Sequence, residues 1–529
     1  MTLAYRVILI VAVLFAEKFL LNFFVDFDAA QAAHGFGAVV RITQHWAFRY
    51  LVTFVAAVAL LCYLRGAPRL AGYSSAVRAI PVRYRWLLLH AALIVALMPL
   101  SYFLYGRDAT AVPFAGLVTL WLLVALAAVL ALLTAMCSWN LWRACADAIG
   151  DIWVYAAIVA SIGAGAMYWS QTLWEPMARM TFHLVQYLLA PVLPLRADPD
   201  TFTLSTDRFA VQISDICSGL EGLGLMSAFC LVWLAFFRRE YVFPQALVLL
   251  PAGLLVVFLL NAVRIAALMV IGHAGAAQVA EYGFHSQAGW IAFNCAAAGL
   301  VFLSRKSPWI SRAASPNHRA PADNPTAAFL MPFLALLAAA MLSRAGSGQF
   351  ESLYGLRLVA GALALAVFWP SLRFLDWGFT WRGVLVGVAA FGVWIWMAPA
   401  SPVQSMPSEL SQLPLLGQGL WLAARIATAV LVVPIAEELA YRGYLMRRLM
   451  SSDFESVPYG RVAPAALLAS ALAFGVAHGS MWLPATLAGV LYGGLLKRSG
   501  RLGEAVAAHA TTNALIAGCV LLRGQWQLW

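Results

Sequence analysis

Apolar runs of about 17 to 25 residues, the length that an α-helix needs to cross the hydrocarbon core of a bilayer, recur along the whole chain. Backbone polar groups inside a bilayer must be hydrogen-bonded within the protein, so such runs form helices. Of the 529 residues, 63% are hydrophobic and 11% are charged, which is more apolar surface than a soluble core buries. We therefore predict an all-α polytopic membrane protein.

The apolar runs fall into two groups, about eight in the first and about seven in the second. The first group lies near residues 4–25, 48–64, 86–105, 112–136, 152–170, 219–236, 242–262 and 287–303. The second group lies near residues 327–343, 356–372, 383–399, 417–436, 463–479, 481–496 and 503–522. Between them, residues 305–326 are rich in Pro, Ser, Asn and charge, which is typical of a linker. No sequence repeat relates the halves, so we predict two different transmembrane bundles, 1–305 and 327–529, joined by a cytoplasmic linker over 306–326.

Lysine and arginine gather in the short turns between the apolar runs, and this explains the formal net charge of +11 without invoking nucleic acid. The most basic turns contain residues 65–85, Arg143, Arg238 with Arg239, and Arg305 with Lys306. All of these turns fall on the cytoplasmic side if the N-terminus is cytoplasmic, as the positive-inside rule requires. The segments then placed outside are 171–218, the turn around 263–285 and the turn at Arg107 and Asp108.

Neither the N-terminus nor the cysteines indicate a secreted soluble domain. The first apolar run is interpreted as an anchor, because no small-residue cleavage site follows it before the polar stretch that begins at Asp26. The seven cysteines are odd in number and include no CxxC pair, which disfavours a disulfide framework or a zinc cluster. Cys217 lies in a polar stretch at the predicted outer face, where we expect a free thiol in an oxidising compartment.

Cys217, Arg264 and His285 form the first set of candidate catalytic residues. Cys217, in VQISDICSGLEGLGL, precedes a span; glycines there permit close backbone approach, and a helix start favours a thiolate. Arg264 lies within the apolar run FLLNAVRIAALMV, where an arginine costs roughly 2.5–3.5 kcal/mol and so tends to face a polar cavity. His285, in EYGFHSQAGW, begins the next span.

The predicted topology brings these three residues to the outer membrane surface. A thiol, an imidazole and a fixed cation can catalyse acyl transfer, with His285 activating the thiol or protonating the leaving amine and Arg264 stabilising the oxyanion. Taken singly, each residue also has an ordinary explanation: a packing cysteine, an anchoring arginine and an interfacial histidine. Periodicity alone favours neither interpretation.

The motif DICSGLEGL, the stretch NAVRIAAL and the histidine after a short outer turn resemble the exosortases, which are multi-spanning bacterial counterparts of sortases. The resemblance covers about residues 1–305 and is strongest over 210–300. It implies that Cys217 is the nucleophile, Arg264 the transition-state stabiliser and His285 the general acid and base. It also implies substrates that are exported proteins with a C-terminal signal made of a short motif, an apolar helix and a basic tail.

The second set of candidate residues begins in VVPIAEELAYRGYLMRRL, at the end of an apolar run. On a helix, Glu438 and Arg442 are four residues apart and can form an ion pair, and we expect this pair to be structural. Glu437 points about 100° away and lacks that partner, so it is a candidate general base.

Two histidines and an asparagine complete this set. His478 lies in AFGVAHGS, while His509 and Asn513 lie on one helical face of AAHATTNAL. A polar network that ties helices together is the structural alternative. Intramembrane polar residues are functional candidates, and for Glu437 with two histidines we favour function.

The patterns EExxxR at 437–442, FxxxH at 474–478 and HxxxN at 509–513 resemble, in the same order, the CAAX-processing and bacteriocin-processing intramembrane proteases (CPBP, Abi-like). The resemblance covers about residues 327–529. It implies that Glu437 and His478 activate the attacking water and that His509 and Asn513 bind the oxyanion. HExxH does not occur, and we predict a metal-free site without a cofactor; zinc held by Glu437, His478 and His509 is the minority alternative.

Simple alternation of spans creates one conflict, because it places Glu437 near the inner face and His478 near the outer face. Either a helix is broken or re-entrant, which is permitted where the backbone is buried in protein, or the predicted boundaries around 463–496 are wrong.

The order of the two segments resembles an exosortase subtype that carries a C-terminal protease and is associated with Val-Pro-Glu-Ile-Asp type signals. We therefore expect a protein-sorting cysteine transpeptidase of a Gram-negative inner membrane, with its site facing the periplasm. The C-terminal module would trim the released tail or process another protein. Expected partners are exported proteins and membrane lipid, without nucleic acid. The competing class is a transporter or channel, which predicts related halves and discontinuous helices.

Overall fold

The computed structural model describes scattered positions before residue 50, most of 50–105, and residues 114–214, 217–312, 324–398 and 405–529. These residues form two compact units, 1–173 and 174–529, and each unit is considered by itself. Most of the predicted first span, the turn at Arg107 and Asp108, and most of the linker lie outside the described residues. The domain boundaries inferred from the sequence stay a prediction.

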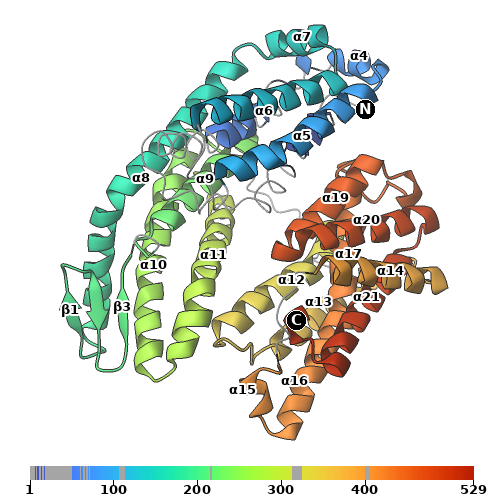
Figure 1. The fold of residues 1–529 in the computed structure, drawn as a ribbon. Coiled ribbons are helices and arrows are strands. Elements are labelled where there is room, and N and C mark those ends of the chain that lie inside the picture. Colours follow the sequence, from blue (N-terminus) through green and yellow to red (C-terminus); the bar gives the residue numbers. More distant parts are fainter. Residues whose placement is uncertain are drawn as a thin grey trace. The chain divides into compact units, whose positions relative to one another are not determined.

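The first unit is helical where it is described (Figure 1). Its helices are α4 (Tyr73–Ala79), α5 (Tyr84–Tyr105), α6 (Phe114–Met136), α7 (Trp139–Ile149) and the first part of α8 (Ile152–Leu189). Helices α5 and α6 pack along each other and correspond to the predicted spans 86–105 and 112–136. A bend of 74° separates α7 from α8, so the predicted span at 152–170 begins after a sharp change of direction.

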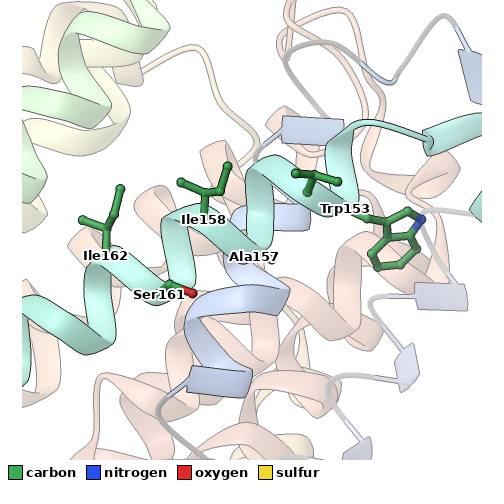
Figure 2. A pocket seen from close by; sticks show the side chains of 6 residues that line it. Trp153, Ala157, Ile158, Ser161 and Ile162 are labelled. Atoms are coloured by element: carbon green, nitrogen blue, oxygen red, sulfur yellow. The ribbon is translucent and has the colours of Figure 1, made fainter.

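One face of α8 forms a shallow hollow in this unit (Figure 2). Its lining residues are Trp153, Val154, Ala157, Ile158, Ser161 and Ile162. The lining contains no ionisable group, and Ser161 supplies its one hydroxyl, so the hollow offers no acid or base for catalysis.

A small sheet interrupts the helical pattern within the predicted outer segment 171–218. Strands β1 (Arg196–Asp198), β2 (Thr203–Ser205) and β3 (Ala210–Gln212) form an antiparallel meander. The β1–β2 turn is held by Asp198, whose carboxylate accepts hydrogen bonds from the Thr201 hydroxyl and the Asp200 N–H. These hydrogen bonds, above all the one from Thr201, hold the pKa of Asp198 below its ordinary value. The sequence analysis did not predict this sheet, because its strands are only three residues long.

Three helices of the second unit follow the sheet and pack on one another (Figure 1). They are α9 (Leu220–Phe236), α10 (Leu249–His273) and α11 (His285–Lys306), and a π-helical turn (Val279–Phe284) precedes α11. Met226, Val257 and Ala296, one from each helix, share an apolar core. A second core joins the C-terminal part of α8 and the sheet to Cys217 and α10.

The remaining helices form the bundle that contains the second set of candidate residues. They are α12 (Pro325–Ala345), α13 (Gly355–Leu372), α14 (Trp381–Met397), α15 (Ser408–Ser411), α16 (Leu415–Ala427), α17 (Val433–Glu438), α18 (Met446–Arg448), α19 (Pro464–Val476), α20 (Trp482–Ser499) and α21 (Leu502–Arg523). Helices α19 with α20, and α14 with α21, make the closest pairs. Gly475 permits the first of these pairs, because a Cβ there would collide with Thr486 Oγ1.

The described residues include nine helical segments that are long and apolar enough to span a membrane, which confirms an all-α polytopic fold. Four predicted spans form shorter helices among the described residues, namely Tyr50–Ala59, α9, α14 and α19. Helix α19 has 13 residues and is about 20 Å long, whereas a hydrocarbon core is about 30 Å thick. Helix α19, which precedes His478, is therefore shorter than the full span that the simple alternation assumes, and the topology of 463–496 stays a prediction.

Candidate active sites

Cys217 lies in a tight loop immediately before α9. Gly219 adopts a φ of +93°, a left-handed conformation that glycine tolerates and that turns the chain into the helix. The Cys217 N–H donates to the Ser214 carbonyl at 3.0 Å, and the Thr181 hydroxyl donates to the Ser218 carbonyl at 3.1 Å. Cys217 is thus three residues ahead of the first helical residue, rather than at the helix start itself, and its side chain is 5% exposed.

Arg264 is connected to this loop by hydrogen bonds of Asn261, which lies one turn earlier on α10. The Asn261 amide nitrogen donates to the Cys217 carbonyl at 3.0 Å, while its oxygen accepts from Arg264 Nη1 at 3.2 Å. The Arg264 Nε is buried and has no protein partner among the described residues. Part of the guanidinium is therefore available to another acceptor, and this is what oxyanion stabilisation requires.

His285 begins α11 and shares this region. Its ring interacts electrostatically with Arg264 and Glu281. A Cβ on Gly289, one turn after His285, would be 3.3 Å from Arg264 Nη1, so the guanidinium lies against this part of α11. The structure thus brings Arg264 and the loop of Cys217 together through hydrogen bonds and places His285 beside Arg264.

The glutamates of the second set lie on one continuous helical run, Leu415–Arg448, that is interrupted by two π-helical turns. These turns, Thr428–Val432 and Leu439–Leu445, flank α17, which ends at Glu438. Turns of this kind inside α-helices often mark functional sites because they redirect side chains.

His509, on α21, lies between the two glutamates. Its Nδ1 is 3.0 Å from Glu438 Oε1, and its Nε2 is 3.8 Å from Glu437 Oε2. Glu438 Oε1 is also 3.1 Å from Arg442 Nη1, so the expected ion pair is present and is almost completely buried. Glu437, expected to lack Arg442 as a partner, faces the imidazole and has no hydrogen-bond partner at Oε2 in the described chain.

Aromatic rings enclose this cluster. Tyr492 stacks on His509, with ring centroids 5.2 Å apart, and its hydroxyl donates to Thr512 at 2.8 Å. Phe474 packs edge-on against His509 and also contacts His478, with centroids 5.6 Å and 4.5 Å away. The two histidines therefore lie on the same aromatic ring, although 31 positions of sequence separate them.

His478 is held in one tautomer. Its Nδ1 donates to the Phe474 carbonyl at 2.7 Å, which leaves the lone pair of the neutral ring on Nε2. The Asn513 amide nitrogen donates to the Ala429 carbonyl at 2.7 Å. Within the described residues, no group of three His, Cys, Asp or Glu side chains is arranged to hold a metal ion. The absence of a metal from this site stays a prediction.

Two family models match the chain. Residues 41–303 match the transmembrane exosortase family, and residues 418–515 match the Type II CAAX prenyl endopeptidase Rce1-like family. Two segments of the chain are thus similar to two families of membrane protease. Neither the curated proteins nor the solved structures contain a match.

The two family assignments confirm the resemblances found in the motifs, in the same order along the chain. The exosortase segment contains Cys217, Arg264 and His285, and the Rce1-like segment contains the glutamates and His509. These similarities indicate a multi-pass membrane protease, and the exosortase family implies the processing of exported proteins. The roles of individual residues stay predictions.

Sequence reasoning missed two side chains that shape these sites, Asn261 and Tyr492. Asn261 was not predicted because a neutral asparagine is a weaker sign of a polar site than the charged arginine three residues later in the same apolar run. Tyr492 was not predicted as a site residue, because nothing in an apolar sequence shows which ring will stack on which histidine. Phe474 belongs to the FxxxH pattern, but its contact with both histidines was not predicted.

Proposed function

We propose that the exosortase segment is a cysteine transpeptidase that cleaves C-terminal sorting signals at the periplasmic face of a bacterial inner membrane. His285 takes the proton of the Cys217 thiol, and the sulfur attacks the carbonyl carbon of the scissile peptide bond. The C–N bond breaks, His285 returns the proton to the leaving amine, and Arg264 stabilises the oxyanion. The acyl group stays on sulfur as a thioester until an acceptor nucleophile takes it and the thiol is released.

The observation that supports this proposal is the continuous path from the Cys217 carbonyl through Asn261 to the guanidinium of Arg264. A cation connected to the nucleophile's loop, with a histidine next to it, is the set of groups that an acyl-transfer site uses. A packing cysteine and an anchoring arginine would not need a shared polar side chain between them.

The test is co-expression of a tagged exported protein that ends in a motif, an apolar helix and a basic tail. Wild-type enzyme should remove the tail, and Cys217→Ala should leave it attached. Cys230→Ala is the matched control, because Cys230 is a buried cysteine of α9 outside the site. Hydroxylamine should intercept the thioester and yield a hydroxamate at the new C-terminus, measured by mass. Removal of the tail by stably produced Cys217→Ala protein would overturn the proposal.

For the Rce1-like segment, we propose a glutamate-dependent, metal-free endopeptidase that cleaves within the membrane. Glu437 and His478 activate a water molecule for attack on the peptide carbonyl. The proton that they take passes to the leaving amine. The supporting observation is that Oε1 of Glu438 is engaged by both Arg442 and His509, whereas the ion-pair contact that Glu437 makes with His509 is longer, at 3.8 Å.

We assign the tail released by the exosortase segment as the substrate of this second site. In Glu437→Gln protein the tail should be released by Cys217 chemistry and then accumulate uncut, as measured by mass spectrometry. Loss of both steps in Glu437→Gln would contradict two independent sites. A tail that wild-type enzyme also leaves uncut would refute the substrate assignment and point to another protein as the substrate.

A further inference from the structure

Asn261 is the one amide side chain that connects the nucleophile's loop to the candidate oxyanion cation among the described residues. It lies on α10, within the candidate span Gln245–His273, where an asparagine must find polar partners. Arg264 is three residues later, so the two side chains share a helix face. Both ends of the amide are used, one on the Cys217 carbonyl and the other on Arg264.

The chemistry of the two partners defines the orientation of this amide. A backbone carbonyl only accepts hydrogen bonds, and a guanidinium only donates them. The Asn261 nitrogen must therefore face Cys217 and its oxygen must face Arg264, because the flipped amide would oppose donor to donor and acceptor to acceptor. Aspartate cannot donate to the carbonyl, and leucine, of similar size, can do neither.

The backbone around Cys217 is shaped to receive this side chain. Gly219, with its left-handed φ, allows the loop to approach α10, and a Cβ there would be 3.1 Å from the Asn261 nitrogen. On the other side of the loop, Thr181 holds the Ser218 carbonyl. The Cys217 loop is thus hydrogen-bonded to α8 through Thr181 and to α10 through Asn261. Asn261 is also the residue that orients Arg264.

We propose that Asn261 is a positioning residue that couples the Cys217 loop to Arg264, so that thiol and guanidinium face the same substrate carbonyl. This proposal rests on the cysteine transpeptidase function proposed above. Because Asn261 acts through two other residues, its loss should lower the rate of the chemical step more than it weakens substrate binding.

The experiment compares Asn261→Leu, Asn261→Asp and Asn261→Gln in full-length protein on the tagged sorting substrate. We expect kcat for tail removal to fall roughly 10- to 100-fold in the Leu and Asp variants, the range for a lost hydrogen bond to a charged group, with KM changed less than about 3-fold. Asn261→Gln, which retains both hydrogen-bonding functions, should recover part of the rate. Asn294→Leu is the matched control, since Asn294 is an asparagine of α11 that donates to the Trp290 carbonyl.

Three outcomes separate the possibilities. Wild-type kcat in Asn261→Leu, with Cys217→Ala inactive, would overturn the positioning role and leave the transpeptidase intact. Activity in Cys217→Ala would instead remove the function on which the role rests. Equal loss in the Leu, Asp and Gln variants, together with loss of Glu437-dependent cleavage, would show misfolding rather than positioning and would also overturn the proposal.

Discussion

The buried pair of Glu438 and Arg442 allows a quantitative test of how the Rce1-like segment is held together. Both side chains are at most 1% exposed, with 3.1 Å between Glu438 Oε1 and Arg442 Nη1. Breaking a buried ion pair by removing one partner costs about 3–5 kcal/mol. The contact is within ion-pair distance but is not aligned as a hydrogen bond, and His509 still contacts Glu438, so we expect the lower end of this range for Arg442→Met.

Replacing both partners should largely restore stability. Methionine retains apolar contact where the Arg442 guanidinium lies 4.3 Å from the Phe474 ring centroid, and the glutamine that replaces Glu438 remains a partner for His509. The free energy of unfolding of the double variant Glu438→Gln/Arg442→Met should therefore lie within about 1 kcal/mol of the wild-type value, because no unpaired charge stays buried. The implied coupling between the two sites is about 2 kcal/mol or more.

The assay is denaturant-induced unfolding of the detergent-solubilised protein, followed together with cleavage by the Rce1-like segment. Glu437→Gln serves as the control, since Glu437 lies outside the pair; it should retain stability within about 1 kcal/mol of wild type and lose cleavage. If the loss of stability in the double variant equals the sum of the two single losses, the pair is not coupled and the reasoning is wrong.

Three further predictions concern packing, backbone conformation and cofactor use. Gly475→Ala should lower stability by about 1–3 kcal/mol in a thermal melt because its Cβ would collide with Thr486, whereas Gly494→Ala, whose Cβ meets nothing within 4 Å, should not. Gly219→Ala should slow tail removal, measured by initial rates, because a left-handed φ costs a non-glycine residue roughly 1–2 kcal/mol and the loop must shift. A strong zinc chelator should leave Glu437-dependent cleavage unchanged, and loss of cleavage that added zinc restores would contradict a metal-free site.

Much of the candidate chemistry was predictable because the motifs are local. The spacing of Glu438 and Arg442 predicts their pairing from the helical repeat alone, and the structure shows that pair. The placement of His509 between the glutamates was not predictable. It depends on a contact across 71 residues, and on π-helical turns whose occurrence a helical pattern does not signal.

The sequence by itself determined that this chain is a helical membrane protein with two different sets of catalytic candidates, because hydrophobic length and short motifs are properties of contiguous residues. Only the tertiary structure decided which polar groups meet. It joined Asn261 to Cys217 and Arg264, and it placed Phe474 between His478 and His509. The physical reason is that helix–helix packing, rather than order along the chain, sets which side chains share a polar site inside the membrane.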